Sequence, residues 1–184
     1  MNRCFWAEGG DALMQAYHDT EWGVPCHDAR ALFELLTLEG AQAGLSWRTV
    51  LVRRDAYRAA YCGFDVPRVA GMSDEALEGL LVAGSGLIRN RLKIFSVRDN
   101  ARAALALPEG LGRYVWSFVG GVPVRNRPAD RAGVPATSAV SDALSRGLKK
   151  AGFRFVGSTI CYAFMQASGM VDDHVRGCFR CVEE

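Results

Sequence analysis

Helical spacing of apolar residues recurs through most of the chain, and it constrains the fold more than any other feature. Between residues 29 and 46, Leu32, Leu36, Glu39 and Ala43 fall on one stripe at i, i+4, i+7 and i+11. No segment sustains the alternation of a half-buried strand, and clusters of Val and Thr are sparse. Because a helix repeats every 3.6 residues and a strand every two, this pattern predicts an all-α domain.

Length and composition set the limits of that domain. A chain of 184 residues, 49% of them hydrophobic, is long enough for one substantial core, so we expect a single domain over residues 1–184. Its longest apolar runs fall far short of the roughly 18 residues that cross a bilayer, and its N-terminus lacks the apolar region of a signal peptide. We therefore expect a cytoplasmic protein with no membrane contact.

The net charge of +2 is too near neutrality to indicate a nucleic-acid partner by itself, although it leaves open the possibility of a local basic face.

A pair of helices joined by a glycine turn is predicted between residues 74 and 105. Ser73 is a good N-cap, and the acids that follow it suit the positive end of a helix dipole. The turn is Gly84-Ser85-Gly86, after which a new helix is expected to begin near Arg89. Such a pair forms an αα-hairpin. Further helices are expected over residues 47–61, 141–152 and 157–168, with a long loop over residues 120–139.

One carboxylate interrupts the apolar stripe of its helix. The stretch from Leu35 to Trp47 reads LLTLEGAQAGLSW, in which nearly every residue is apolar or small except Glu39 and Gln42. The spacing turns Glu39 inward, where an unpaired charge is costly. This carboxylate therefore needs a partner, and Gly40 beside it is expected to leave room for one.

Cysteine and histidine residues lie near both ends of the chain. His174 and Cys178 are four residues apart, which directs both to one side of a helical turn, and Cys4 and His18 lie at the other end. Together they form a Cys2His2 set of the kind that binds zinc tetrahedrally. Four protein ligands leave no open position, so the site would be structural rather than catalytic.

Spacing alone leaves other assignments open. Cys178 and Cys181 form a C-x-x-C pair that could act with His174 and one N-terminal ligand, and Cys26 and His27 add further choices. The pattern also fits scattered buried thiols without a metal. Disulfides are disfavoured in a chain that has no secretion signal.

Six blocks of sequence cover almost the whole chain. They are CFW at 4–6, YHDTEWGVP at 17–25, LEGAQAGLSW at 38–47, GLIRNRLKI at 86–94, SDAL at 141–144, and FVGSTICYAFMQASGMVDDHVRGC at 155–178. In this order they resemble the 3-methyladenine DNA glycosylase I family. The resemblance implies a helix-hairpin-helix DNA glycosylase fold in which one structural Zn²⁺ per chain joins the termini through Cys4, His18, His174 and Cys178.

The resemblance also implies an activity and a base-binding site. The expected reaction is hydrolysis of the N-glycosidic bond of 3-methyladenine in alkylated double-stranded DNA, the first step of base excision repair. Tyr17, Glu39 and Trp47 fall on the family's base-binding positions, and Glu39 is the expected catalytic residue. The chain departs from the family at Met14, where several relatives have tyrosine, and at Gly84, where many have an acid.

DNA contact is expected at the hairpin. Backbone N–H groups of the glycine turn can hold a phosphate, and nearby cations add positive charge. The residues concerned are Gly84, Gly86, Arg89, Arg91 and Lys93. Leu45 is a candidate wedge for the gap left by a flipped base, or alternatively an ordinary helix-end anchor. Asp99, on the helix after the turn, is interpreted as a solvated acid.

Two other classes of function compete with a monomeric, monofunctional glycosylase. One is a zinc-stabilised helical protein that binds damaged DNA without catalysis. The other is a zinc hydrolase with a different substrate, which would need an open coordination position. A lyase is disfavoured because the matched pocket segments contain no lysine to form a Schiff base.

Overall fold

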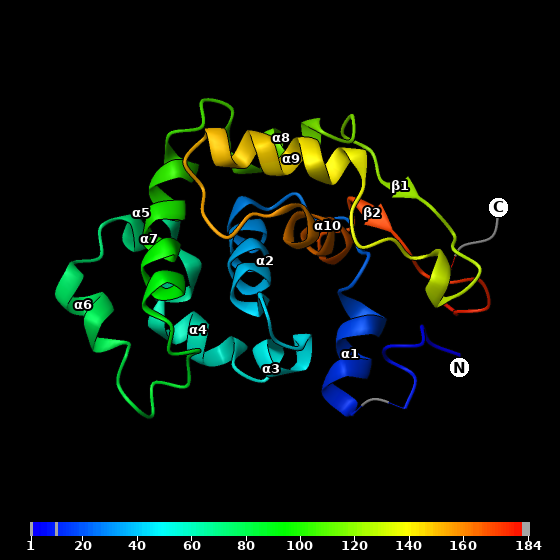
Figure 1. The fold of residues 1–184 in the computed structure, drawn as a ribbon, viewed down its shortest axis with the longest axis horizontal. Helices are drawn as coiled ribbons and strands as arrows, with labels where there is room; N and C mark the ends of the chain where they lie inside the picture. The colour runs from blue at the N-terminus through cyan, green and yellow to red at the C-terminus, as the bar shows by residue number, and fades with distance from the viewer. Residues whose placement is uncertain (1, 10, 182–184) are drawn as a thin grey trace.

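The computed structural model describes residues 2–9 and 11–181 (Figure 1). Helices dominate it, which confirms the predicted class. The helices are α1 Ala12–Thr20, α2 Ala29–Gln42, α3 Trp47–Leu51, α4 Arg54–Ala60, α5 Val66–Ala70, α6 Asp74–Gly79, α7 Arg91–Leu105, α8 Gly110–Ser117, α9 Ala139–Lys150 and α10 Ser158–Ala167, with 3-10 turns at Cys62–Phe64 and Arg131–Gly133. Among the described residues, none of these helices has the length and hydropathy needed to cross a membrane.

Two short strands depart from the predicted all-α fold. β1 (Val124–Arg125) pairs in parallel with β2 (Val171–Asp172), with Val124 opposite Val171 (Figure 1). Strands of two residues carry no detectable alternation, so the sequence could not predict them. Their pairing fastens the long segment after α8 to the backbone just before His174.

The core forms around α2 and α10, which lie together at the centre of the molecule (Figure 1). Leu32 and Leu38 of α2 and Phe164 and Met165 of α10 are all fully buried. Burying one such side chain stabilises the fold by roughly 1.5–3 kcal/mol. The body of α2 is therefore held in place by packing against α10, which fixes the direction of the residues at its end.

Both helices of the predicted hairpin form, but α6 ends at Gly79 and eleven residues separate it from α7, so the connection is longer than the predicted glycine turn. The Ser73 hydroxyl accepts a hydrogen bond from the Ala76 N–H at 3.2 Å and caps α6. The second helix is capped by Asn90 and begins at Arg91, slightly later than expected. Gly86 is required in the turn because its φ is +75° and an added Cβ would lie 2.7 Å from the Cβ of Ala56.

Other helix boundaries differ from the predictions. The helix expected over residues 47–61 is divided at Arg53, whose backbone is not helical. The helix expected to begin at Ser141 begins one turn earlier, because Ser138 caps it and forms a reciprocal capping box with Ser141. Both serines suit an N-cap, and the sequence alone did not favour the first. The predicted stop is correct, since Gly152 follows the last turn with φ of +96°.

Candidate functional site

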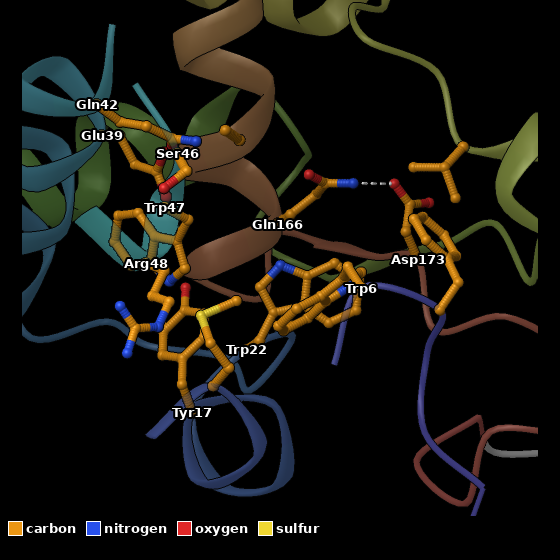
Figure 2. Close-up of a pocket in the computed structure, with 14 residues that line it drawn as sticks. Trp6, Tyr17, Trp22, Glu39, Gln42, Ser46, Trp47, Arg48, Gln166 and Asp173 are labelled. Atoms are coloured by element: carbon orange, nitrogen blue, oxygen red, sulfur yellow. Dashed lines mark hydrogen bonds between the residues drawn. The ribbon is translucent and has the colours of Figure 1, made fainter. Parts of the chain in front are cut away.

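A cavity of about 400 Å³ lies where α1, α2, α3 and α10 meet (Figure 2). Aromatic rings form much of its wall, and most of its polar side chains come from α2, α3 and α10. The lining residues are Phe5, Trp6, Met14, Tyr17, Trp22, Glu39, Gln42, Ser46, Trp47, Arg48, Val134, Ala163, Gln166 and Asp173. All three predicted base-binding residues are therefore brought into one cavity.

The aromatic residues form two neighbouring pairs. Tyr17 and Trp47 have ring centroids 5.2 Å apart at an interplanar angle of 45°. Trp6 and Trp22 meet edge-on, with centroids 5.1 Å apart. Because the face of an aromatic ring carries negative potential, a cavity with such walls favours a flat, positively charged ligand.

Glu39 is the buried acid of this cavity. It lies in the last turn of α2, is 3% exposed, and its Oε2 has no hydrogen-bond partner among the described residues. Burial raises its pKa to about 8. The pKa of Tyr17 is raised well above its usual value, first by burial and then by the charge of Glu39. A cationic ligand that donates a hydrogen bond would favour the ionised form of Glu39 and satisfy an acceptor that the protein leaves unpaired.

Gly40 does not leave room in the cavity, so that explanation of the sequence is wrong. A Cβ on Gly40 would lie 3.2 Å from the Cβ of Phe155, in the segment between α9 and α10. The absence of a side chain instead lets that segment pack closely against α2.

The indole of Trp47 adds an unpaired donor to the cavity. Its Nε1 is buried and has no partner among the described residues. Trp47 begins α3 because Ser46 caps that helix, with the Ser46 hydroxyl accepting from the Thr49 N–H at 3.2 Å. The cavity thus offers both an acceptor and a donor to a ligand that has polar edges.

Gln166 and Asp173 form a second polar end of the cavity, which sequence reasoning missed. Asp173 Oδ2 accepts hydrogen bonds from Gln166 Nε2 and from the Tyr162 hydroxyl, each at 2.7 Å. Its Oδ1 accepts from Asn126 Nδ2, also at 2.7 Å. The sequence signal that could have identified Gln166 was a single amide in a mostly apolar helix. The other cavity residues that were not assigned there are Phe5, Trp6, Met14, Trp22, Gln42, Ser46, Arg48, Val134 and Ala163.

The four predicted metal ligands are brought together beside the cavity. Cys4, His18, His174 and Cys178 are buried, and their ligand atoms all lie within 4.8 Å of one another. Burial raises the pKa of the Cys4 thiol to about 12, so binding of a metal would displace its proton. The group formed by these four residues, here called the Cys/His cluster, could hold a metal ion, and Cys181 is not part of it.

The histidines of the Cys/His cluster are oriented by carboxylates. His18 Nδ1 lies 2.8 Å from an Asp19 oxygen, and His174 Nδ1 lies 2.7 Å from an Asp172 oxygen. This arrangement turns Nε2 of each ring toward the cysteines. His18 Nε2 accepts from the Cys4 N–H at 3.2 Å and lies 3.4 Å from Cys178 Sγ, and His174 Nε2 is buried without a partner among the described residues. An orphaned ring nitrogen directed into a set of thiols is what a metal site of this composition requires.

The cations near the hairpin turn have different surroundings. Arg89 and Arg91 are both exposed, and Arg91 pairs with Glu78 at 2.5 Å and lies over the ring of Phe95. Lys93 Nζ donates to the carbonyl oxygens of Ala41 and Ala43, at 2.9 and 2.7 Å. The ammonium group of Lys93 is therefore directed at the end of α2, and burial lowers its pKa.

Leu45 and Asp99, which were also considered from the sequence, lie outside the cavity. Leu45, in the turn between α2 and α3, is 41% exposed. Asp99 forms an ion pair with Arg154 at 3.4 Å and does not line the cavity. Its surroundings agree with the interpretation of Asp99 as an ordinary surface acid.

Comparisons with known proteins agree with this site. A family model described as methyladenine glycosylase matches residues 6–181. DNA-3-methyladenine glycosylase 1 of Escherichia coli (strain K12) is 50% identical over 181 residues, covering 97% of this chain and 96% of that protein. A crystal structure of 3-methyladenine DNA glycosylase I superposes with a TM-score of 0.95 at 50% identity, covering 98% of this chain and 100% of that one.

A second solved structure shows a relative with a ligand. It is a variant of 3-methyladenine DNA glycosylase I in complex with 3-methyladenine, with a TM-score of 0.93 and 30% identity, and all of both chains is covered. The share of the chain that is matched, the sequence identity and the structural superposition all indicate the same family. This chain therefore belongs to the methyladenine glycosylase family.

Proposed function

We propose that this protein hydrolyses the N-glycosidic bond of 3-methyladenine in alkylated double-stranded DNA, as the first step of base excision repair. The observation that carries the proposal is the unpaired carboxylate of Glu39 inside an aromatic cavity. Relatives over nearly the full length are named for this activity, and one solved relative holds 3-methyladenine. Release of the free base from methylated duplex DNA tests it.

The chemistry of the lesion suits this cavity. Methylation at N3 makes the adenine cationic, so the base is already an activated leaving group. Faces of aromatic rings attract such a cation by roughly 0.5–2 kcal/mol each. A buried carboxylate that accepts hydrogen bonds from the base adds about 1.5–3 kcal/mol. Ordinary adenine is neutral and would leave Glu39 poorly matched, which supplies discrimination.

Hydrolysis then needs little acid catalysis. The bond from C1′ to the base breaks, and its electron pair stays on the base and neutralises the positive charge. Water adds to C1′ of the oxocarbenium-like sugar and loses a proton to solvent. Tyr17, Glu39 and Trp47 bind the flipped base. Glu39 acts as the catalytic residue by accepting hydrogen bonds from the base and holding it in position while the positive charge passes to the sugar.

The proposed reaction is monofunctional. A lyase would need an amine to form a Schiff base with the sugar. Among the described residues that line the cavity, none is a lysine. Lys93, which was predicted from the sequence to contact DNA, donates its hydrogen bonds to backbone carbonyl groups.

We further propose that the Cys/His cluster holds one structural Zn²⁺ per chain. Cys4, His18, His174 and Cys178 would complete a tetrahedral site without an open position, which argues against a zinc hydrolase. When bound, the metal would tie the two ends of the chain together and take no part in the reaction. His18 would then be fixed, and Tyr17, its neighbour in α1, would be fixed with it.

DNA binding is proposed at the hairpin and at the turn after α2. Backbone N–H groups of the turn and exposed positive charge would hold a phosphate, and Leu45 would fill the gap left by the extruded base. The residues proposed to contact DNA are Gly84, Gly86, Arg89, Arg91, Lys93 and Leu45. Of these cations Arg89 has the most open surroundings. We propose that the protein acts as a monomer in the cytoplasm.

A further inference from the structure

We propose that Gln166 selects the kind of purine, favouring a base with a 6-amino group over one with a 6-oxo group. In chemical terms, Gln166 would favour an alkylated adenine over an alkylated guanine. This inference rests on the proposed glycosylase function and adds the residue that sets its specificity. It follows from the orientation of a single amide.

Gln166 lies on the cavity side of an otherwise apolar helix. One turn before it on α10, Ala163 also lines the cavity, whereas the neighbouring Phe164 and Met165 are fully buried in the core. Figure 2 shows the Gln166 side chain between the group formed by Glu39 and Gln42 on one side and Asp173 on the other. A ligand in the cavity would therefore meet this amide.

The hydrogen bonds of Asp173 fix which end of the amide faces the cavity. Asp173 is 1% exposed, and both of its oxygens accept hydrogen bonds from Tyr162, Asn126 and Gln166. A carboxylate only accepts, so the NH₂ end of Gln166 must face it. A rotated amide would place two acceptors together in a buried site. The Gln166 carbonyl oxygen is consequently directed away from Asp173, as Figure 2 shows.

Two acceptors therefore face this cavity from different elements. One is the unpaired Oε2 of Glu39 on α2, and the other is the carbonyl oxygen of Gln166 on α10. A 6-amino purine offers two N–H donors at its exocyclic nitrogen, and methylation at N3 makes them more positive. A 6-oxo purine presents an acceptor at the same position, so one acceptor would stay unpaired and desolvated. Sites built in this way discriminate by the penalty they impose on the wrong ligand.

Substitution of Gln166 tests this directly. Gln166→Met keeps a similar volume but removes the acceptor and the bond to Asp173. Tyr162→Phe is the matched control, because it removes a different hydrogen bond to Asp173, lies outside the cavity lining and leaves the Gln166 amide in place. Both variants and the wild type are incubated with duplex DNA methylated by dimethyl sulfate, and the released 3-methyladenine and 3-methylguanine are separated and quantified.

The quantity that tests the inference is the ratio of the release rates of 3-methyladenine and 3-methylguanine. We expect Gln166→Met to lower the ratio of 3-methyladenine to 3-methylguanine release by about tenfold or more, and Tyr162→Phe to keep it within about threefold of wild type. A general loss of stability would slow both releases together and leave their ratio unchanged. An unchanged ratio in Gln166→Met overturns the assignment.

A binding measurement separates this inference from the proposed function. Quenching of the cavity tryptophans by the two free bases reports binding without cleavage, and Gln166→Met should lose the preference for 3-methyladenine. If the wild type releases neither base from DNA, the glycosylase function fails. If the wild type releases 3-methyladenine while Gln166→Met keeps both the release ratio and the binding preference, only the role of Gln166 fails.

Discussion

The indole of Trp22 meets the imidazole of His174 edge-on, with ring centroids 4.7 Å apart and both side chains buried. Trp6 makes a similar contact with His18, at 5.2 Å. Trp6 and Trp22 line the cavity, whereas the two histidines belong to the Cys/His cluster. The cluster and the cavity thus share a wall, and disorder in one would be transmitted to the other.

Removal of the proposed metal should destabilise the protein and loosen base binding. Structural zinc contributes several kcal/mol to folding, so a chelator or His174→Ala should lower the Tm by about 10 °C or more. The control is Cys26→Ser, which removes a half-buried thiol outside the cluster. Elemental analysis and thermal melts with and without chelator test this. Purified protein that contains no zinc and melts at the same temperature with chelator would show the metal assignment to be wrong.

Glu39→Gln should stabilise the free protein, and increasingly so as pH rises. Burial raises the pKa of Glu39 to about 8 from an ordinary value of 4.5, so the folded state holds this proton more tightly than the unfolded state does. Between these pH values the folded state binds more protons, and the contribution of Glu39 to stability therefore falls as pH increases. The variant lacks this penalty and should gain up to about 4 kcal/mol over wild type by pH 8.

Urea unfolding of wild type and Glu39→Gln at pH 5, 6.5 and 8 measures that gain. All other titratable groups are common to both proteins, so the difference between them isolates Glu39. A stability difference that stays constant over this range would contradict a buried acid with a raised pKa.

Arg89 and Lys93 should behave differently, although both are proposed to contact DNA. Arg89 is exposed, so Arg89→Ala should weaken DNA binding and reduce the slope of log affinity against log salt by about one. Lys93→Met removes two hydrogen bonds to the end of α2 and should cost about 1–3 kcal/mol of stability with a smaller change in that slope. Fluorescence anisotropy at several salt concentrations, together with thermal melts, distinguishes the two. Equal salt slopes for both variants would contradict this difference and show that Lys93 binds phosphate as strongly as Arg89 does.

Leu45→Ala should slow excision from duplex DNA by roughly tenfold if Leu45 fills the gap left by the flipped base. Binding of free 3-methyladenine should not change, because Leu45 does not line the cavity. Leu13 on α1 has the same exposed fraction, 41%, and Leu13→Ala is the matched control. Should the two variants excise the base equally fast, Leu45 is only a helix-end anchor.

The residues found from the sequence are those whose signal is local. The helical spacing of apolar residues predicted that Glu39 is buried, although no partner was known. Ser73 and the acidic residues that directly follow it predicted the start of a helix. Sequence spacing left several metal sets open, and resemblance to the family selected the four residues that lie together.

The residues missed from the sequence depend on distant contacts. Asp173 is held by Asn126, 47 residues earlier, so the orientation of Gln166 could not be inferred from its own helix. Lys93 looked like a free cation because its partners, the carbonyls of Ala41 and Ala43, precede it by 52 and 50 residues. Such contacts depend on how helices pack, which no local pattern encodes.

The most direct test of the account is release of free 3-methyladenine from methylated duplex DNA by wild type and by Glu39→Gln, with a protein-free sample to measure spontaneous loss. Because Glu39→Gln is expected to fold at least as stably as wild type, a loss of activity would report on the chemistry. We predict rapid release by wild type and a rate lower by about 10- to 100-fold for the variant. No release by wild type, or undiminished release by Glu39→Gln, would contradict the central claim that this buried carboxylate receives the cationic base.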